Sequence, residues 1–395
     1  MRLPLREIFS VNKYMDELID STNYLLKLMK NRGPQASEPT PNMVTLLYQN
    51  EVGGLEIRKK SDGEWIDVQP SSNSFLVMIG ESFCVRAEAN LPVIDFSNPN
   101  LKPGSPEWDS VKHQVREAMV EYSSFLASVD QIMELKNAIS EALEQTFDLP
   151  VETKKLYVPD KHFYGYAVSS SGLFERIMHD EAQIAKNIEQ RLTTAYWPQG
   201  NINFSKTLIS FSELTSRLEK TIKRMILEIF GVGKYADDLI DNTNYMLKLI
   251  KYSPPPNGEP TGILFPHYDK NMVSLLYQNE VHALQVQSKD GEWIHVKPSP
   301  NTLIVMVGES LSAWLNGRLS ATYHHVLLKG NKARYNMALF SSTREGYPVK
   351  APAELVDDKN PIMFKPFDYE EYLKFYFSQV PLGRAGSSIQ AYCGV

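Results

Sequence analysis

The chain has 395 residues, of which 43% are hydrophobic and 22% are charged, and its net charge is -6. These values are ordinary for a globular protein. No cluster of Lys and Arg forms a basic face, so neither a nucleic acid nor an anionic membrane is expected as a partner. Two cysteines are too few for a disulfide framework and indicate a reducing compartment. The start lacks the apolar core of a signal peptide and no apolar run could cross a bilayer, so we expect a cytoplasmic protein.

The first part of the chain is an internal repeat. Two blocks of residues 1–90 recur almost letter for letter in residues 228–316, for example NMVTLLYQNEV from Asn42 and NMVSLLYQNEV from Asn271. Near-identity between only two copies favours a recent partial duplication over a solenoid. The first copy lacks the segment GILFPHYDK and ends near Cys84. We therefore predict residues 1–90 to be a partial, degenerate duplicate without metal ligands, and not an independent domain.

Residues 91–230 are predicted to form a separate strand and helical region that follows the first copy of the repeat. The segment LPVIDF predicts a first strand, followed by a loop rich in Pro and Gly. Apolar residues at helical spacing predict a helix with Asp109 or Ser110 as its N-cap, and a second helix that is closed by Pro150. A third amphipathic helix is predicted over residues 205–230.

Short β-rich runs separated by turns such as KDGE, PSPN and KGNK dominate residues 231–395. This pattern is typical of a β-sandwich or barrel. We predict a mainly β protein with flanking helices, whose core is a double-stranded β-helix (a jelly roll, cupin-like) with an N-terminal helical region. The tail DYEEYLKFYFSQV is predicted to close this domain as a helix.

Candidate metal ligands lie in this β-rich half. His267 and Asp269 are two residues apart, so in an extended segment both point to the same side. A nitrogen ligand from a distant strand would complete two histidines and one carboxylate on one face of an octahedron, as in non-haem Fe(II) oxygenases. His324 is our candidate, and its neighbour His325 faces the other way. The alternative for His267 and Asp269 is a solvated loop pair.

Arg334 follows the second candidate histidine by ten residues. An arginine that points into a jelly-roll core is costly unless it meets a carboxylate, which its planar fork binds bidentately. A bound 2-oxoglutarate would supply that carboxylate, and the alternative for Arg334 is a surface salt bridge. His282 and His295 lie beside turns and are predicted to be surface residues.

Three segments carry a family resemblance: FPHYDKNMVSLLYQ, GEWIHVKPSPNTLIVMVGESLSAWLNGRLSATYHHVLLKGNKARYNMALF and APAELVDDKNPIMFKPFDYEEYL. They resemble the plant 2-oxoglutarate- and Fe(II)-dependent dioxygenases, closest to the AOP-type branch of specialised metabolism. The resemblance covers about residues 91–395. It implies Fe(II) held by His267, Asp269 and His324, with 2-oxoglutarate and dioxygen as co-substrates and ascorbate as the reductant.

The same resemblance implies that Arg334, helped by Tyr252 and Asn336, binds 2-oxoglutarate. Three residues depart from the family pattern. Tyr268 replaces the usual threonine between the first two ligands, His325 replaces the arginine after the metal histidine, and Asn336 replaces a serine. The amide of Asn336 can still donate a hydrogen bond to a carboxylate.

The segment KHFYGYAVSSSGLFERIMHD resembles the region that borders the substrate in this family, so Phe163, Tyr164 and Phe174 are candidate pocket residues, with core packing as the alternative. The predicted function is oxidation, foremost hydroxylation, of a small plant metabolite by a monomer, with release of succinate and CO2. One rival is a catalytically impaired paralogue that binds a metabolite or partner without turnover. A second rival is an Fe(II) cupin without a 2-oxo acid requirement, against which Arg334 argues.

Overall fold

The computed structural model describes residues 90–161, 164–379 and 389–395, together with four short strands between residues 44 and 79. The chain divides into two compact units, Met1–Arg86 and Ala87–Val395. Each unit is described by itself below.

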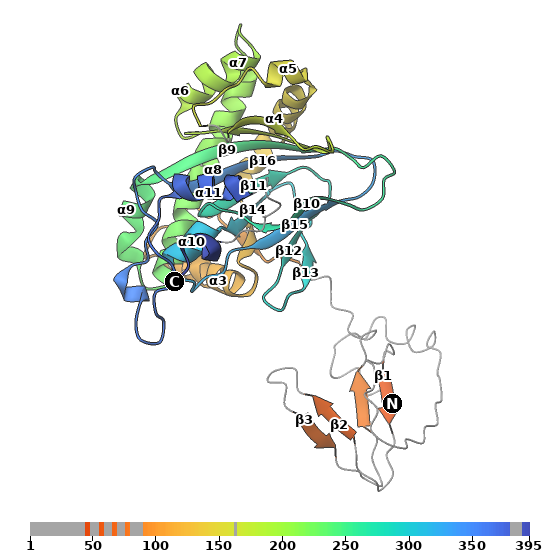
Figure 1. Ribbon diagram of the computed structural model, residues 1–395, viewed down its shortest axis with the longest axis vertical. Helices are drawn as coiled ribbons and strands as arrows, with labels where there is room; N and C mark the ends of the chain where they lie inside the picture. The colour runs from red at the N-terminus through yellow and green to blue at the C-terminus, as the bar shows by residue number, and fades with distance from the viewer. Residues whose placement is uncertain are drawn as a thin grey trace. The chain divides into compact units, whose positions relative to one another are not determined.

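The first unit contains two antiparallel strand pairs (Figure 1). The pairs are β1 (Val44–Leu47) with β4 (Leu76–Ile79), and β2 (Leu55–Arg58) with β3 (Trp65–Val68). Val44 lies opposite Ile79, just as Val273 lies opposite Val307 in the second copy of the repeat. The duplicated sequence therefore reproduces the strand register of its counterpart.

The second unit is built on two sheets. The larger sheet has the order β5-β6-β14-β11-β16-β9-β8-β7, and the smaller sheet has the order β10-β15-β12-β13 (Figure 1). All neighbouring strands are antiparallel except β5 and β6. In chain order the strands are β5 (Val93–Asp95), β6 (Ser124–Ser128), β7 (Gly165–Val168), β8 (Phe174–His179), β9 (Thr243–Tyr252), β10 (Thr261–Tyr268), β11 (Val273–Gln278), β12 (Leu284–Gln287), β13 (Trp293–His295), β14 (Thr302–Val307), β15 (Tyr323–Leu328) and β16 (Arg334–Thr343).

Strand side chains alternate between the two faces of a sheet, and both faces of the larger sheet are covered. Leu247 and Leu249 of β9 belong to the core that the sheet shares with helices α3 (Pro106–Tyr122), α4 (Asp130–Asp148) and α8 (Ile202–Ile229). Met246 and Ile250, on the other face of the same strand, pack with residues of the smaller sheet such as Val286 and Val326. Two facing antiparallel sheets with helices outside confirm the predicted jelly-roll core.

The first long helix begins earlier than the sequence predicted. Its N-cap is Ser105, whose hydroxyl accepts a hydrogen bond from the Trp108 N–H at 3.1 Å, and Pro106 occupies the first turn. Proline is favoured there because its missing N–H would be unpaired anyway. The prediction of a start at Asp109 or Ser110 is therefore wrong.

The second, third and C-terminal helices lie where the sequence predicted them, the last being α11 (Tyr369–Gln379). The shorter helices are α5 (Val151–Lys154), α6 (Ala185–Asn187), η2 (Ile188–Thr193), α7 (Thr194–Tyr196), η3 (Gly233–Tyr235), α9 (Ala236–Asp241), α10 (Glu309–Trp314), η4 (Ala353–Leu355) and α12 (Ile389–Cys393). Within the described ranges, no helix combines the length and the apolar character needed to cross a membrane.

A buried polar cluster fixes β9 against α8. Lys223 and Glu219 are both fully buried on α8, with Nζ 2.8 Å from Oε1. Lys223 also donates to the hydroxyl of Thr243 at 2.7 Å, and the Tyr245 hydroxyl donates to Glu219 at 2.8 Å. Desolvation offsets much of the attraction in such a pair, so its main effect here is to hold β9 in one position. That strand ends at Tyr252, which belongs to the site described next.

Candidate metal and co-substrate site

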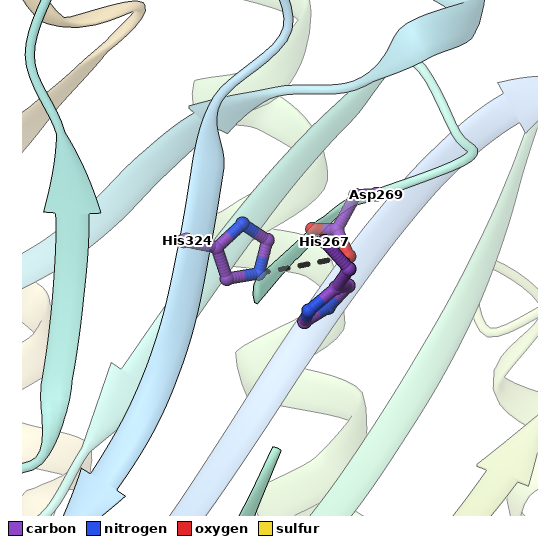
Figure 2. A group of neighbouring side chains, drawn as sticks. All are labelled: His267, Asp269 and His324. Carbon is purple, nitrogen blue, oxygen red and sulfur yellow. Dashed lines mark ion pairs between the residues drawn. The ribbon is translucent and has the colours of Figure 1, made fainter. Parts of the chain in front are cut away.

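Three side chains of types that can bind a metal converge between β10 and β15 of the smaller sheet. His267 at the end of β10 lies directly opposite His324 on β15, and Asp269 follows β10 immediately. One ligand atom from each of the three lies within 4.8 Å of the others. The Nε2 atoms of His267 and His324 lie 3.9 Å and 4.0 Å from Asp269 Oδ1. Figure 2 shows the three side chains directed toward one another.

Backbone carbonyls fix the orientation of both imidazoles. The Nδ1 atom of His267 lies 2.8 Å from the Phe265 carbonyl, and that of His324 lies 3.0 Å from the Thr322 carbonyl. Because a carbonyl can only accept, each Nδ1 carries the proton and each Nε2 presents a lone pair. Such partners are what orients histidine ligands in metal sites. The two rings therefore face the centre of the cluster in the tautomer that a metal needs.

The charge state of the cluster also suits a cation. Ser274 donates its hydroxyl to Asp269 Oδ2 at 2.6 Å, which leaves Oδ1 for a metal. Burial opposes ionisation of Asp269, but the two imidazoles and this hydroxyl outweigh it and lower the pKa of the carboxyl. Burial, followed by the neighbouring His324, lowers the pKa of His267 to about 3. The cluster thus offers a carboxylate and a neutral imidazole at neutral pH, as metal binding requires.

The two adjacent histidines on β15 have different surroundings, as the alternation predicts. His324 is buried and belongs to the cluster. His325 is directed away from it: its ring stacks on Trp293 with 4.1 Å between ring centres, and its Nε2 lies 2.9 Å from Gln285 Oε1. His325 therefore packs β15 against β12 and β13. Of the remaining candidates, His295 is exposed, as predicted.

Arg334 is fully buried, so the alternative of a surface salt bridge is wrong. Its Nη2 and Nε donate to Gln278 Oε1 at 2.6 Å and 3.2 Å, and its Cζ lies 5.1 Å from the ring centre of Tyr252. Among the residues that the structure describes, Arg334 Nη1, Gln278 Nε2 and Asn336 Oδ1 are buried without a hydrogen-bond partner. Buried polar atoms are normally paired. The two unpaired donors, Arg334 Nη1 and Gln278 Nε2, fit a ligand that carries a carboxylate, as 2-oxoglutarate does, whereas Asn336 Oδ1 is an acceptor.

Two of the three candidate substrate-pocket residues can be placed in the structure. Tyr164 is buried and belongs to the core between the sheets. Phe174 is half-buried on β8, and its ring lies 5.3 Å from that of Tyr252. Phe163 lies outside the described residues. Pocket roles for these three residues stay a prediction.

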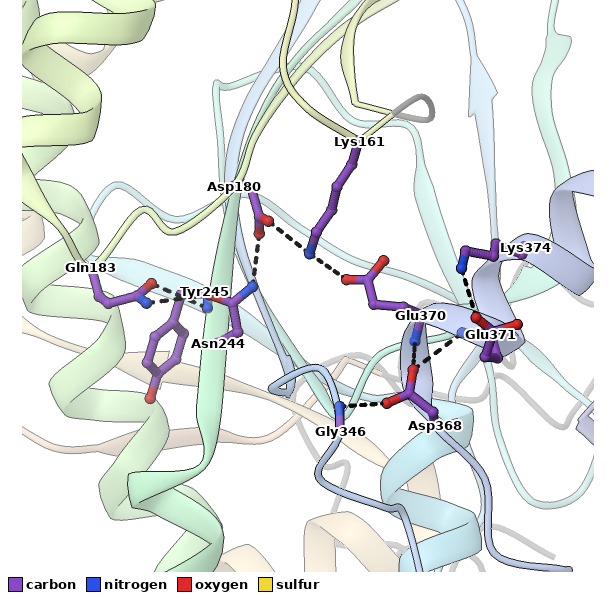
Figure 3. Close-up of polar contacts among 10 residues, drawn as sticks. All are labelled: Lys161, Asp180, Gln183, Asn244, Tyr245, Gly346, Asp368, Glu370, Glu371 and Lys374. Carbon is purple, nitrogen blue, oxygen red and sulfur yellow. Dashed lines mark hydrogen bonds and ion pairs between the residues drawn. The ribbon is translucent and has the colours of Figure 1, made fainter.

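An ion-pair network holds the segment that leads to Tyr164 (Figure 3). Lys161 Nζ lies 2.8 Å from Asp180 and 2.5 Å from Glu370, at the start of α11. Asp180 in turn accepts from the amide of Asn244 on β9 at 2.7 Å. Segments that are distant in sequence are thereby joined at the edge of the larger sheet.

Ser274 and Gln278 were missed by the sequence analysis. Both belong to β11, in the run VSLLYQ, where they lie four residues apart on the face that points to the smaller sheet. The period of two, applied to this run, places both on one face together with Leu276. Polar residues at such spacing in an otherwise apolar strand are the signal that could have found them.

Comparisons with known proteins agree with this geometry. The 2OG-Fe(II) oxygenase superfamily model matches residues 22–94 and 242–343, and the model for the N-terminal region of the non-haem dioxygenase in morphine synthesis matches residues 91–198. The probable 2-oxoglutarate-dependent dioxygenase AOP1.2 of Arabidopsis thaliana is 42% identical over 305 residues, which cover 75% of this chain and 94% of that protein. The 2-oxoglutarate-dependent dioxygenase AOP3 of the same plant is 30% identical, over 77% of this chain and 97% of its own length.

A solved structure with the same fold supports the jelly-roll architecture. The crystal structure of a dioxygenase for auxin oxidation in rice superposes with a TM-score of 0.65 at 21% identity, covering 77% of this chain and all of that one. A jelly roll that brings two histidines and an aspartate together has the ligand set of an Fe(II)-dependent oxygenase. The chain belongs to the 2-oxoglutarate- and Fe(II)-dependent dioxygenase family, in its AOP branch.

Proposed function

We propose that this dioxygenase hydroxylates a small plant specialised metabolite and releases succinate and CO2 from 2-oxoglutarate. The observation that carries the proposal is the convergence of His267 Nε2, Asp269 Oδ1 and His324 Nε2. We assign these three atoms as the ligands of Fe(II). When bound, Fe(II) supplies the redox chemistry that couples dioxygen to the 2-oxo acid and to the substrate.

The remaining polar residues are proposed to hold 2-oxoglutarate. Arg334 binds a carboxylate of the co-substrate through its unpaired Nη1, and Gln278 keeps the guanidinium in that orientation through its two contacts. Tyr252 covers the guanidinium. Asn336, which faces the same side of β16 as Arg334, donates its amide N–H to the co-substrate in place of the usual serine.

Slow formation of succinate without any added substrate tests this assignment. Purified protein supplied with Fe(II), 2-oxoglutarate, dioxygen and ascorbate is expected to release succinate, and omission of iron is expected to stop it. The reaction needs no knowledge of the substrate, since members of this class decarboxylate the 2-oxo acid in its absence. A protein that binds Fe(II) and 2-oxoglutarate but releases no succinate would favour the impaired paralogue instead.

We further infer that residues 1–90 are a partial duplicate that carries no site. Relative to Asn271, the corresponding Asn42 is preceded by EPTP in place of the segment that contains His267 and Asp269. The match to the second copy ends near Cys84, before any counterpart of the third ligand or of the co-substrate arginine. These absences support the second copy as the only working one.

A shortened chain that begins at Asn90 is expected to form succinate at the rate of the full chain. The unit from Ala87 to Val395 contains its own core and all proposed ligands, so it has no need of residues 1–89. Circular dichroism and a thermal melt of both proteins check the folding, and the succinate assay checks the site. If the shortened chain fails to fold, the first unit is structural and our inference is wrong.

A further inference from the structure

The junction between β14 and α10, residues 308–310, binds the backbone of the loop that carries Asp269. Each of the four consecutive carbonyls of residues 269–272 accepts a hydrogen bond from this junction, at distances from 2.6 to 3.1 Å. The Glu309 N–H, for example, donates to the Asp269 carbonyl at 2.8 Å. The backbone of this proposed ligand is therefore held from the side of α10.

The same junction contacts the segments that carry two of the three proposed ligands. On the side of Asp269, a Cβ added to Gly308 would overlap the Asn271 carbonyl, so only glycine allows this approach. On the side of His324, the residue before the junction, Val307, exchanges hydrogen bonds with Thr322. The Thr322 carbonyl in turn accepts from His324 Nδ1 at 3.0 Å. A shift of the junction would therefore be felt by both ligands.

The side chain of Glu309 extends these contacts to the end of the chain. Its carboxylate is buried, and Oε2 accepts from Lys270 Nζ and from the Tyr372 hydroxyl, both at 2.6 Å. Oε1 accepts from the backbone N–H of Ile389 at 3.1 Å. Lys270 directly follows Asp269, whereas Tyr372 belongs to α11 and Ile389 to α12, and the C-terminus lies beside α10 (Figure 1). One carboxylate thus joins the ligand loop to both C-terminal helices.

We propose that Glu309 is a positioning residue of the iron site, through which α11 and α12 fix the Asp269 carboxylate. A buried carboxylate that accepts three hydrogen bonds, one of them from an ammonium, is firmly held. Its own N–H binds Asp269 and its side chain binds the next residue, so Asp269 has to follow any displacement of Glu309. Groups behind the ligands of a metal orient those ligands in this way. The inference rests on the proposed function, because it concerns the same site.

The variant Glu309→Gln tests the proposal, because glutamine keeps the size of the side chain but removes its charge. The buried ammonium of Lys270 then loses the carboxylate that neutralises it, so the ligand loop is expected to shift. We expect Mn²⁺ to bind the full chain about tenfold more weakly, as measured by electron paramagnetic resonance. The Fe(II) concentration for half-maximal succinate formation should rise by a similar factor, with little change in the maximal rate.

The variant Glu219→Gln is the matched control for stability. Glu219 is also buried, lies 2.8 Å from the ammonium of Lys223, and accepts from the Tyr245 hydroxyl at 2.8 Å. It belongs to α8, which packs on the face of the larger sheet that points away from the smaller sheet. We expect this variant to melt at a lower temperature than the wild type and to bind Mn²⁺ with unchanged affinity.

A second variant, Tyr372→Phe, removes one donor from Glu309 Oε2 and keeps the ring. It should also weaken Mn²⁺ binding, by a smaller factor than Glu309→Gln, and it replaces that variant if Glu309→Gln does not fold. Wild-type affinity for Mn²⁺ in the folded variants would overturn the proposal. An equal loss of affinity in Glu219→Gln would do the same, because it would leave Glu309 with only a general contribution to folding.

The two proposals fail in different ways. The Mn²⁺ measurement needs no turnover, so it tests the role of Glu309 even in a protein that releases no succinate. A wild type that binds Mn²⁺ but forms no succinate would reject the proposed function alone. A wild type that forms succinate, with a Glu309→Gln variant that binds Mn²⁺ normally, would reject the role of Glu309 alone.

Discussion

Replacement of His324 by alanine is expected to abolish iron-dependent succinate formation, while replacement of its neighbour His325 leaves most of it. The two residues differ in surroundings but not in chemistry. His324 Nε2 points to Asp269 Oδ1 at 4.0 Å, whereas the His325 ring stacks on Trp293 outside the cluster. Loss of an outer-shell partner typically costs 10- to 100-fold in metal affinity or activity. Removal of a ligand itself should cost at least about 100-fold.

The pair of variants also separates a lost ligand from a lost fold. Both substitutions remove an imidazole from the same strand, so near-ultraviolet circular dichroism should show native packing in both. Electron paramagnetic resonance of added Mn²⁺ should then show weakened binding only in His324→Ala. If His325→Ala stopped the reaction and His324→Ala did not, the ligand assignment would be reversed and our reading of β15 would be wrong.

The convergence of the three candidate ligands could be predicted from the sequence because alternation along a strand is a strict geometric rule. His267 and Asp269 are two residues apart and His324 and His325 are adjacent, so the rule places the first two together and separates the others. The structure follows it at all four positions. The strands of the β-rich half could also be predicted. The short apolar runs between turn sequences form strands of the two sheets.

Other features depend on contacts between residues that are distant in sequence. Gln278 gains its role only because β11 pairs with β16, which brings it beside Arg334. The start of the first helix was misplaced for a local reason, because Ser105 followed by proline is itself a strong cap and start signal.

Replacement of Arg334 by methionine is expected to weaken 2-oxoglutarate binding by about 10²- to 10⁴-fold, because loss of one partner of a buried ion pair costs about 3–5 kcal/mol. The free protein should tolerate this change well. Burial lowers the pKa of Arg334, and its Nη1 has no partner in the described part of the chain. Methionine removes a buried cation that has no ion pair in the described residues, but it also leaves the buried Gln278 Oε1 without its two donors. The two contributions oppose each other, so the unliganded variant should melt close to the temperature of the wild type.

Thermal melts with and without ligand distinguish these two effects. A ligand that binds only the folded state raises the melting temperature in proportion to its affinity. We expect 2-oxoglutarate with Mn²⁺ to raise the melting temperature of the wild type and of Arg344→Met, whose arginine is exposed just beyond β16, but not that of Arg334→Met. An unchanged ligand shift in Arg334→Met would mean that the co-substrate carboxylate is held elsewhere.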